Sequence, residues 1–434
     1  MTPSYALSPQ TAQHLAAIDR FLVPEQPNVM AYFVDRLFPA HNLRERLLRH
    51  IARFSPTPLS RVLLSVRGGP HVSGQLHSLD AGNEATHLNR AAETLAVVLD
   101  TNRTQFLADT PLEQVKDPVW ISLADYPGQW RHRVMAFIFT EKNDIPVAVL
   151  KARPADTAGN SLRDEWTALQ QLRQRLSPRL RAYVPLPYKY GVCDGIEALL
   201  FSAFPGRSAY VEMRGSLNPR RRIELHFGAA GQWLADFHSE TRHSGQAFDL
   251  IGLEHTVLNT ICDRFDISMP PDYQGLDADC ERSPIALVAG HGDFWARNLL
   301  ITDGGMLDGI VDWEHFRAAA PPFDDLFNFA ITYGQEYAWS LTRGIHSYTK
   351  TDAFDWTFIT DTVLSRQVKT YLSRYCSRTG LQASLLARLL PIYLLSRAYD
   401  CINADVPISK DEECEFWLTC YRMLTTTTQS VFSG

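Results

Sequence analysis

Residues 291–316 of the chain read HGDFWARNLLITDGGMLDGIVDWEHF. Within it, Asn298 directly precedes a short apolar run, and the Asp-Gly-Gly sequence at 303–305 is a strong turn signal. A second apolar run follows this turn and ends at Asp312. The pattern predicts an antiparallel hairpin that returns the chain on itself, so that Asn298 and Asp312 are near neighbours at its open end.

Two side chains of this hairpin are of the kind that magnesium prefers. Asn298 offers an amide oxygen and Asp312 a carboxylate, and Mg²⁺ takes few such hard protein ligands while keeping water and phosphate oxygens. Asp293, in the loop that leads into the hairpin, is placed to accept a proton from an attacking hydroxyl or to orient it. The alternative interpretation is a buried polar turn in an unrelated α/β fold.

The spacing of these residues resembles a known family. H-G-D-x-x-x-x-N followed by D-W-E is similar to the catalytic loop and metal segment of the aminoglycoside phosphotransferase and choline kinase-like superfamily, whose fold is similar to that of protein kinases. The resemblance implies that Asp293 is the catalytic base, that Asn298 and Asp312 are magnesium ligands, and that His291 supports the loop. Downstream, P-F-D-D-L resembles the family's P-x-x-D-L segment, which implies that Asp325 braces the catalytic loop.

Upstream, two charged residues interrupt apolar faces. Lys151 ends a predicted strand face that also carries Val147 and Val149. Glu165 interrupts a leucine stripe on a helix predicted over 161–176. Burying either charge alone is costly, so the two are natural partners. The resemblance implies a Lys151–Glu165 ion pair, with Lys151 also reaching the α- and β-phosphates of ATP. In the alternative interpretation, Lys151 extends to solvent and Glu165 lies at the edge of its stripe.

The remaining nucleotide contacts follow from the same resemblance. ALLFSAFPG, residues 198–206, is similar to the family's last small-lobe strand and hinge, which implies that the backbone of Ser202, Ala203 and Phe204 pairs with the adenine edge. Between the first two strands, protein kinases carry G-x-G-x-x-G over the phosphates. This chain has YPGQW at 126–130, with a single glycine, and so departs from that pattern.

The distribution of strand and helix patterns predicts an α+β, bilobal, protein-kinase-like fold. β-rich runs separated by turn residues, with one helix among them, give way to a mainly helical pattern that short strands interrupt once. We expect a small antiparallel-sheet N-lobe with one helix and a mainly helical C-lobe, preceded by an N-terminal α/β extension. The expected boundaries are 1–115 for this extension of unknown role, 116–205 for the N-lobe, and 206–434 for the C-lobe with the catalytic loop and substrate site.

Composition excludes several classes of protein. The net charge of -6 disfavours a dedicated nucleic-acid binder. The chain has no run of 18 apolar residues and no signal-peptide pattern, so we expect no membrane span. Its seven cysteines form no C-x-x-C pair and fit reduced thiols in the cytoplasm, and we therefore expect a cytoplasmic protein. The sequence indicates no oligomeric state.

These observations predict an ATP- and Mg²⁺-dependent phosphotransferase acting on a small-molecule hydroxyl. Acidic residues in the helical region are either attractors of a cationic acceptor or a solvated helix face: Asp324, Asp400, Asp405 and the run at 411–413. The expected acceptor is a sugar, an aminoglycoside-like molecule or an amino alcohol, and we weight a sugar or glycoside above an amino alcohol. Two other functions stay open. One is a kinase of a peptide or protein hydroxyl, and the other is a non-catalytic nucleotide-binding partner.

Overall fold

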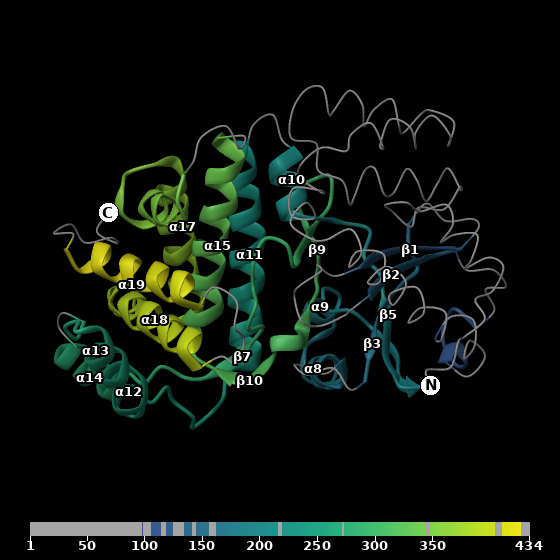
Figure 1. Cartoon of the computed structure of the whole chain (residues 1–434), viewed down its shortest axis with the longest axis horizontal. Coiled ribbons are helices and arrows are strands. Elements are labelled where there is room, and N and C mark those ends of the chain that lie inside the picture. Colours follow the sequence, from purple (N-terminus) through teal and green to yellow (C-terminus); the bar gives the residue numbers. More distant parts are fainter. Residues whose placement is uncertain are drawn as a thin grey trace. The chain divides into compact units, whose positions relative to one another are not determined.

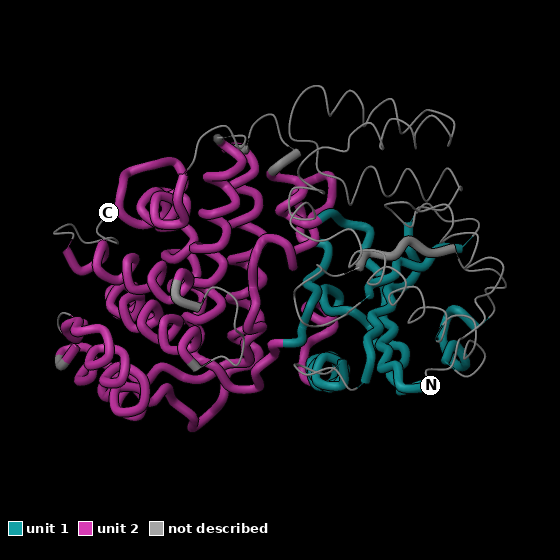
Figure 2. The backbone as a smooth tube through the Cα atoms, viewed as in Figure 1, with its two compact units in different colours: residues 1–174, 182–207, 308–314 teal, residues 175–181, 208–307, 315–434 magenta. Residues whose placement is uncertain are grey.

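The computed structural model divides into two compact units (Figure 2). Unit 1 comprises residues 1–174, 182–207 and 308–314, and unit 2 comprises residues 175–181, 208–307 and 315–434. The structure describes residues 98, 106–113, 119–124, 134–140, 145–155, 162–215, 219–270, 273–342, 348–403 and 410–426. Apart from 98 and 106–113, the predicted N-terminal extension lies outside the described residues, as does the YPGQW segment.

Unit 1 contains a five-stranded antiparallel sheet and one long helix (Figure 1). The strand order is β1-β2-β3-β5-β4, and α8 (Leu162–Arg175) follows β3 along the chain. The strands are β1 (Val119–Ala124), β2 (Val134–Phe139), β3 (Ala148–Pro154), β4 (Pro187–Cys193) and β5 (Ile196–Ser202). This arrangement confirms the predicted small sheet with a single helix between its third and fourth strands.

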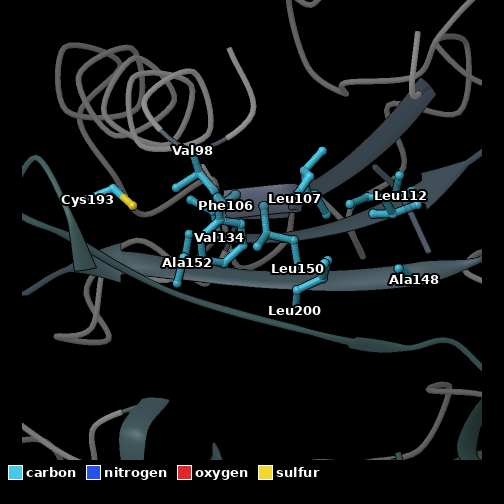
Figure 3. Packing of buried hydrophobic residues seen from close by; sticks show 13 residues of the cluster. Val98, Phe106, Leu107, Leu112, Val134, Ala148, Leu150, Ala152, Cys193 and Leu200 are labelled. Atoms are coloured by element: carbon cyan, nitrogen blue, oxygen red, sulfur yellow. The ribbon is translucent and has the colours of Figure 1, made fainter. Parts of the chain in front are cut away.

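The two faces of the sheet are covered by different clusters because successive side chains of a strand point to opposite sides. On one face, Leu150 and Leu200 pack with Phe106 and Leu107 (Figure 3). On the other face, the cluster contains Val149, Leu162, Leu199 and Phe201, so α8 covers this side. The sequence also placed Val147 on the face of Val149, and that placement was wrong. Because β3 begins at Ala148, Val147 lies outside its alternation and packs with the first cluster.

Unit 2 is mainly helical, as predicted (Figure 1). Its helices before the HGD sequence are α9 (Pro178–Arg181), α10 (Ala209–Gly215), α11 (Pro219–Thr241), α12 (Leu250–Leu253), η3 (Glu254–Leu258), α13 (Asn259–Phe265) and α14 (Tyr273–Arg282). Those after it are α15 (Phe323–Thr342), α16 (Lys350–Phe354), η5 (Asp355–Ile359), α17 (Val363–Thr379), α18 (Ala383–Asn403) and α19 (Lys410–Thr426).

Short strands interrupt the helices around the HGD sequence. β7 (Val288–Gly290) pairs antiparallel with β10 (Arg317–Ala320), and both belong to unit 2. The others are β6 (Arg207–Ser208), β8 (Leu299–Ile301), β9 (Leu307–Ile310) and the one-turn 3-10 helix η4 (Trp313–His315). The turn before β9 is closed by two backbone hydrogen bonds, from Thr302 N to Met306 O and from Gly305 N to Thr302 O.

The core of unit 2 is built from aromatic side chains of three helices. Phe227 of α11 meets Phe329 and Tyr333 of α15 and Tyr371 of α17 edge-on, with ring centroids 4.7–5.2 Å apart. Edge-to-face contacts of this kind stabilise a core beyond simple burial of area. At Gly231 of α11, an added Cβ would lie 2.6 Å from the Tyr371 ring, so α11 and α17 approach closely there. This rigid helix group carries the loop described next.

Taken unit by unit, the structure confirms the predicted α+β class: a small antiparallel sheet with one helix, and a mainly helical remainder with a small strand insertion. No helix among the described residues is both long enough and apolar enough to cross a membrane.

Candidate active site

Unit 1 holds three interacting charged side chains, Lys151, Glu165 and Asp312, which we call the charge triad. Lys151 Nζ donates to Glu165 Oε1 and Oε2 at 2.9 and 2.8 Å, and to Asp312 Oδ1 at 2.7 Å. Lys151 is 6% exposed and Glu165 is 1% exposed. The ion pair expected between the strand lysine and the helix glutamate is therefore present, and Asp312 is its third member.

The members of the charge triad shift one another's pKa values. Burial by itself lowers the pKa of Lys151, but the carboxylates of Asp312 and Glu165 outweigh it and raise that pKa, so the lysine is charged. Burial raises the pKa of Glu165, Lys151 opposes this, Asp312 and Glu314 reinforce it, and the net shift is upward. The side chain of Asp312 is 33% exposed, and its carboxylate is a hard ligand of the kind that a magnesium ion takes.

The backbone around Asp312 is held in an unusual conformation. Its φ is 69°, in the left-handed region that few residues other than glycine adopt. The next residue, Trp313, is fully buried and donates its backbone N–H to Glu165 Oε1 at 3.3 Å and its ring N–H to Ile310 O at 2.9 Å. Strained backbone of this kind persists where surrounding contacts enforce it, often at functional sites. This role of Trp313 was not predicted from the sequence, although the residue lies in the D-W-E motif.

The segment expected to pair with adenine makes contacts within unit 1. Ser202 donates its N–H to Leu186 O at 2.9 Å, and its Oγ accepts the Leu186 N–H at 2.9 Å. The Ser202 N–H is thus used inside the protein, so it is not available to pair with adenine as the resemblance implied. An added Cβ at Gly309 would lie 2.5 Å from the Phe204 ring, so this ring rests directly on β9.

Unit 2 presents the loop of residues 291–298, which we call the HGD loop. Asp325, in the first turn of α15, accepts the N–H of His291 through Oδ2 at 2.6 Å and that of Gly292 through Oδ1 at 2.9 Å. Gly292 has φ 82°, and an added Cβ would lie 2.1 Å from the carbonyl oxygen of His315. The glycine of the motif is therefore required by both conformation and space, and Asp325 makes the bracing contact that the resemblance implied.

The polar side chains of the HGD loop orient one another. His291 is fully buried, and its Nδ1 accepts the N–H of Asp293 at 3.2 Å. Asn298 donates its Nδ2 to Asp293 O at 2.9 Å and to Asp293 Oδ2 at 3.2 Å. These bonds fix which way the Asn298 amide points, and its remaining atom, Oδ1, is the one that suits a hard cation. The side chain of Asp293 is in turn held by the hydrogen bond that its Oδ2 accepts from the Asn298 amide.

An apolar anchor sits inside the same loop. Phe294 is fully buried, stacks on Trp233 of α11 with ring centroids 5.8 Å apart, and lies 5.5 Å from Phe329 of α15. Because Phe294 follows Asp293 directly, this packing limits how far the Asp293 backbone can shift. Sequence reasoning did not single out Phe294; a large apolar residue inside an otherwise polar loop was the available indication.

Two buried histidines, His238 and His291, lie close to the Asp325 carboxylate. His238 of α11 has Nε2 3.9 Å from Asp325 Oδ2 and Nδ1 2.6 Å from the Tyr375 hydroxyl. Burial lowers the pKa of His238. Burial alone would raise the pKa of Asp325, but the neighbouring His238 and His291 outweigh it and lower it. The Asp325 carboxylate is thus ionised, as an acceptor of two backbone N–H groups should be.

The structure therefore brings the predicted site residues together in two sets, one in each unit. Unit 1 holds Lys151, Glu165, Asp312 and the segment at 202–204, and unit 2 holds the HGD loop with Asp325. Among the described residues, no group of three or more His, Cys, Asp and Glu side chains could hold a metal ion. A magnesium site of one carboxylate, one amide oxygen, water and phosphates is of a different kind.

Comparisons with known proteins agree with these features. A model of the phosphotransferase enzyme family matches residues 125–340, a part of the chain that includes both sets of site residues. The match confirms the resemblance that the motifs predicted. No curated protein matches this chain significantly.

Solved structures similar to this chain include two kinds of kinase. A thermostable mutant of aminoglycoside phosphotransferase APH(4)-Ia, in a ternary complex with ADP and hygromycin B, is 13% identical over 72% of this chain and 96% of its own, with a TM-score of 0.45. A choline/ethanolamine kinase family protein from Mesorhizobium loti is 15% identical over 77% and 99%, with a TM-score of 0.38. Choline kinase LicA from Streptococcus pneumoniae is 11% identical over 72% and 96%, with a TM-score of 0.39.

Proposed function

We propose that this chain is an ATP- and Mg²⁺-dependent phosphotransferase that moves the γ-phosphoryl group to a hydroxyl of a small molecule. The observation that carries the proposal is the charge triad. A buried lysine held by a helix glutamate and extended to an aspartate in a strained turn is costly to build for stability alone. The same arrangement suits the phosphates and metal of a nucleotide.

Each site residue has a role in this proposal. Lys151, oriented by Glu165, binds the α- and β-phosphates, and the backbone of Ala203 and Phe204 pairs with adenine. Asp312 and Asn298 hold the magnesium ion, which neutralises charge that develops on the phosphates. Because phosphoryl transfer requires little covalent help from a protein, positioning supplies most of the acceleration.

The HGD loop acts on the acceptor. Asp293 accepts a hydrogen bond from the acceptor hydroxyl, aims its oxygen at the γ-phosphorus, and takes the proton as the new oxygen–phosphorus bond forms and the bond to the β-phosphate oxygen breaks. His291 and Asp325 hold the loop in place for this step.

The acceptor is proposed to be a sugar or glycoside hydroxyl rather than a polycation. Of the acidic residues that were candidates for attracting a cation, Asp324 is paired with Arg317 at 2.8 Å and Asp400 with Arg397 at 3.1 Å. A carboxylate already paired with a guanidinium attracts a cationic ligand less strongly. Among the other candidates, Glu412 and Glu413 are exposed at the start of α19, and Asp405 and the side chain of Asp411 lie outside the described part of the chain.

The experiment is phosphate transfer from γ-labelled ATP with Mg²⁺ into fractionated metabolite and peptide extracts, comparing the native chain with Asp293→Asn. We expect a labelled neutral metabolite that only the native chain makes. Label in a peptide would identify a peptide kinase instead. Nucleotide binding without any label that depends on Asp293 would favour a non-catalytic partner, and label in an aminoglycoside fraction would contradict the proposed acceptor class.

Two further proposals concern the setting of this activity. We propose that 116–205 and 206–434 act as the nucleotide-binding and acceptor-binding domains, and that 1–115 is an N-terminal extension, of which Phe106 and Leu107 pack on the sheet of unit 1. We also propose a cytoplasmic location, supported by free cysteines at 193, 262, 280, 376, 401, 414 and 420. Neither a nucleic acid nor a membrane is proposed as a partner.

A further inference from the structure

Arg297, the residue directly before Asn298, ties the HGD loop to two helices of unit 2. Its guanidinium lies 4.4 Å from the centroid of the Tyr210 ring and 4.7 Å from that of the Trp295 ring. It also donates through Nη2 to Glu336 Oε1 at 3.1 Å. Tyr210 belongs to α10 and Glu336 to α15, so one side chain joins α10, the loop and α15.

The same two helices also hold the loop backbone. Tyr210 of α10 donates its N–H to Ala296 O at 3.1 Å. On α15, the side chain of Asn328 donates to Phe294 O at 3.2 Å. With a rotation of about 100° per residue, Asp325, Asn328 and Glu336 lie within about 80° of one another around α15. One face of α15 thus contacts the first, middle and last parts of the loop.

We propose that Arg297 is a positioning residue for Asn298, with Tyr210 and Glu336 as its supports. Asn298 presents Oδ1 in a fixed direction only while its Nδ2 donates both bonds to Asp293, and these bonds depend on where the backbone at 297–298 lies. The Arg297 side chain is 48% exposed, and Glu336 below it is 12% exposed. A half-exposed side chain is free to move unless specific contacts hold it. Arg297 makes three such contacts, with Tyr210, Trp295 and Glu336.

The chemistry of arginine explains why this residue suits the position. A planar guanidinium stacks on aromatic rings and at the same time donates to a carboxylate, whereas a lysine ammonium is a point charge that does neither task as well. Arg297 touches none of the reacting groups in the proposed mechanism, so its effect acts through Asn298. The inference therefore rests on the proposed function, in which Asn298 is a ligand of the metal.

The test compares Arg297→Ala, Arg297→Lys, Glu336→Gln and the double variant Arg297→Ala/Glu336→Gln with the native chain. The matched control is Glu415→Gln, which breaks the Arg422–Glu415 pair on α19, a 2.9 Å Arg–Glu contact with 44% and 59% exposure. For each chain, kcat, KM for ATP, and the Mg²⁺ concentration at half-maximal rate are measured. Thermal unfolding is followed in parallel.

We expect Arg297→Ala to lower kcat and raise the Mg²⁺ requirement, each by about 10- to 100-fold, as loss of a residue supporting a metal ligand commonly does. KM for ATP should change by less than about two-fold, because the phosphate-binding lysine is untouched. Arg297→Lys should recover only part of the loss. The double variant should be little worse than Arg297→Ala, because its two residues act as one unit, and Glu415→Gln should resemble the native chain.

Three results would overturn the inference, and they separate its failure from that of the proposed function. An Arg297→Ala variant with native kcat and Mg²⁺ requirement, in a chain that transfers phosphate, rejects the inference alone. An Arg297→Ala variant with lower thermal stability and lower kcat, but with the native Mg²⁺ requirement, would show that Arg297 has a purely structural role. If the native chain transfers no phosphate, the proposed function fails. In that case, Mn²⁺ binding in the presence of ADP is measured by electron paramagnetic resonance for the native and Arg297→Ala chains. Weaker Mn²⁺ binding by Arg297→Ala supports the inference. Equal Mn²⁺ binding by the two chains, or no Mn²⁺ binding by either, contradicts it.

Discussion

At the scale of single residues, the buried Lys151–Glu165 pair of the charge triad is stable only while both charges are present. Lys151 satisfies the carboxylate of Glu165, which is 1% exposed, and removing Lys151 leaves that buried carboxylate without its cation. Such removals commonly cost about 3–5 kcal/mol, whereas replacing a whole buried pair by apolar groups is often neutral. Stability and function therefore depend on Lys151 in different ways, and substitutions can separate them.

Lys151→Met should lower the free energy of unfolding by about 3–5 kcal/mol, because Glu165 is left buried without its cation. The double variant Lys151→Met/Glu165→Leu should recover most of that loss, yet bind nucleotide no better than the single variant. Urea unfolding and fluorescent-ADP titration measure the two quantities. A double variant that recovers nucleotide binding along with stability would show that Lys151 does not contact phosphate.

Gly292→Ala tests the tight turn of the HGD loop against a matched glycine. Gly245, also in unit 2, has the same φ of 82°, but an added Cβ there meets nothing within 4 Å. Both substitutions incur the left-handed conformational cost of about 1–2 kcal/mol, and only Gly292→Ala adds a clash with His315 O. We expect Gly245→Ala to keep native turnover and Gly292→Ala to lose most of it. Equal effects on stability and turnover would show that the close approach at Gly292 is unimportant.

At the scale of elements, the start of α15 carries two adjacent aspartates with opposite pH behaviour. The pKa of Asp325 is lowered by its histidine neighbours against the effect of burial. The pKa of Asp324 is raised to about 6 by burial, opposed by Arg317. A lowered carboxyl pKa contributes stability that is present above the unfolded-state pKa and is lost as the pH falls. A raised one contributes stability that is present below that pKa and is lost as the pH rises towards 6.

Removing each carboxyl in turn should therefore change the pH profile of stability in opposite directions. Relative to the native chain, Asp325→Asn should be destabilised most above about pH 5, with the difference shrinking as the pH falls below the unfolded-state value of about 3.9. The native chain should lose stability as the pH rises from about 4 to 6, because the pKa of Asp324 is raised, and Asp324→Asn should lose less stability over this range. Urea unfolding at a series of pH values measures both. Profiles that run parallel to the native one would contradict these pKa shifts.

Elements with a clear period were predictable from the sequence, and elements set by remote contacts were not. The leucine stripe predicted a helix over 161–176, within one residue of the observed bounds of α8, and the predicted strand segments at 147–151 and 198–206 overlap β3 and β5. The sequence did not indicate β10, whose residues Arg317–Ala320 carry no alternation and are mostly exposed. The π-helices η3 and η5 were also missed, because one extra residue in a turn leaves no mark on hydrophobic spacing.

The candidate site shows the same division. The motif residues could be predicted because their spacing along the chain is fixed. Their supports could not, since they come from distant segments. The Gly206 N–H donates to Asp308 across a separation of 102 residues, and Asn328 reaches Phe294 across 34. The left-handed backbone of Asp312 is likewise enforced by its surroundings and is invisible in the sequence.

At the scale of the whole molecule, the candidate site residues fall in two compact units. Unit 1 carries the charge triad, and unit 2 carries the HGD loop with its brace. In the proposed function, unit 1 binds the nucleotide and supplies one metal ligand, and unit 2 binds the acceptor and supplies the other metal ligand. A substitution in either unit should then reduce the same reaction, although the two units have separate hydrophobic cores.

Magnesium-dependent turnover of Asp312→Asn is the measurement that tests this account most directly. The variant is compared with the native chain and with Asp303→Asn, which changes an exposed acid in the hairpin turn of unit 2. We expect γ-phosphate transfer from ATP to stop on removal of Mg²⁺, to fall by at least ~10²-fold in Asp312→Asn, and to stay native in Asp303→Asn. A folded Asp312→Asn chain with native turnover, or transfer that continues without a divalent cation, would contradict the account.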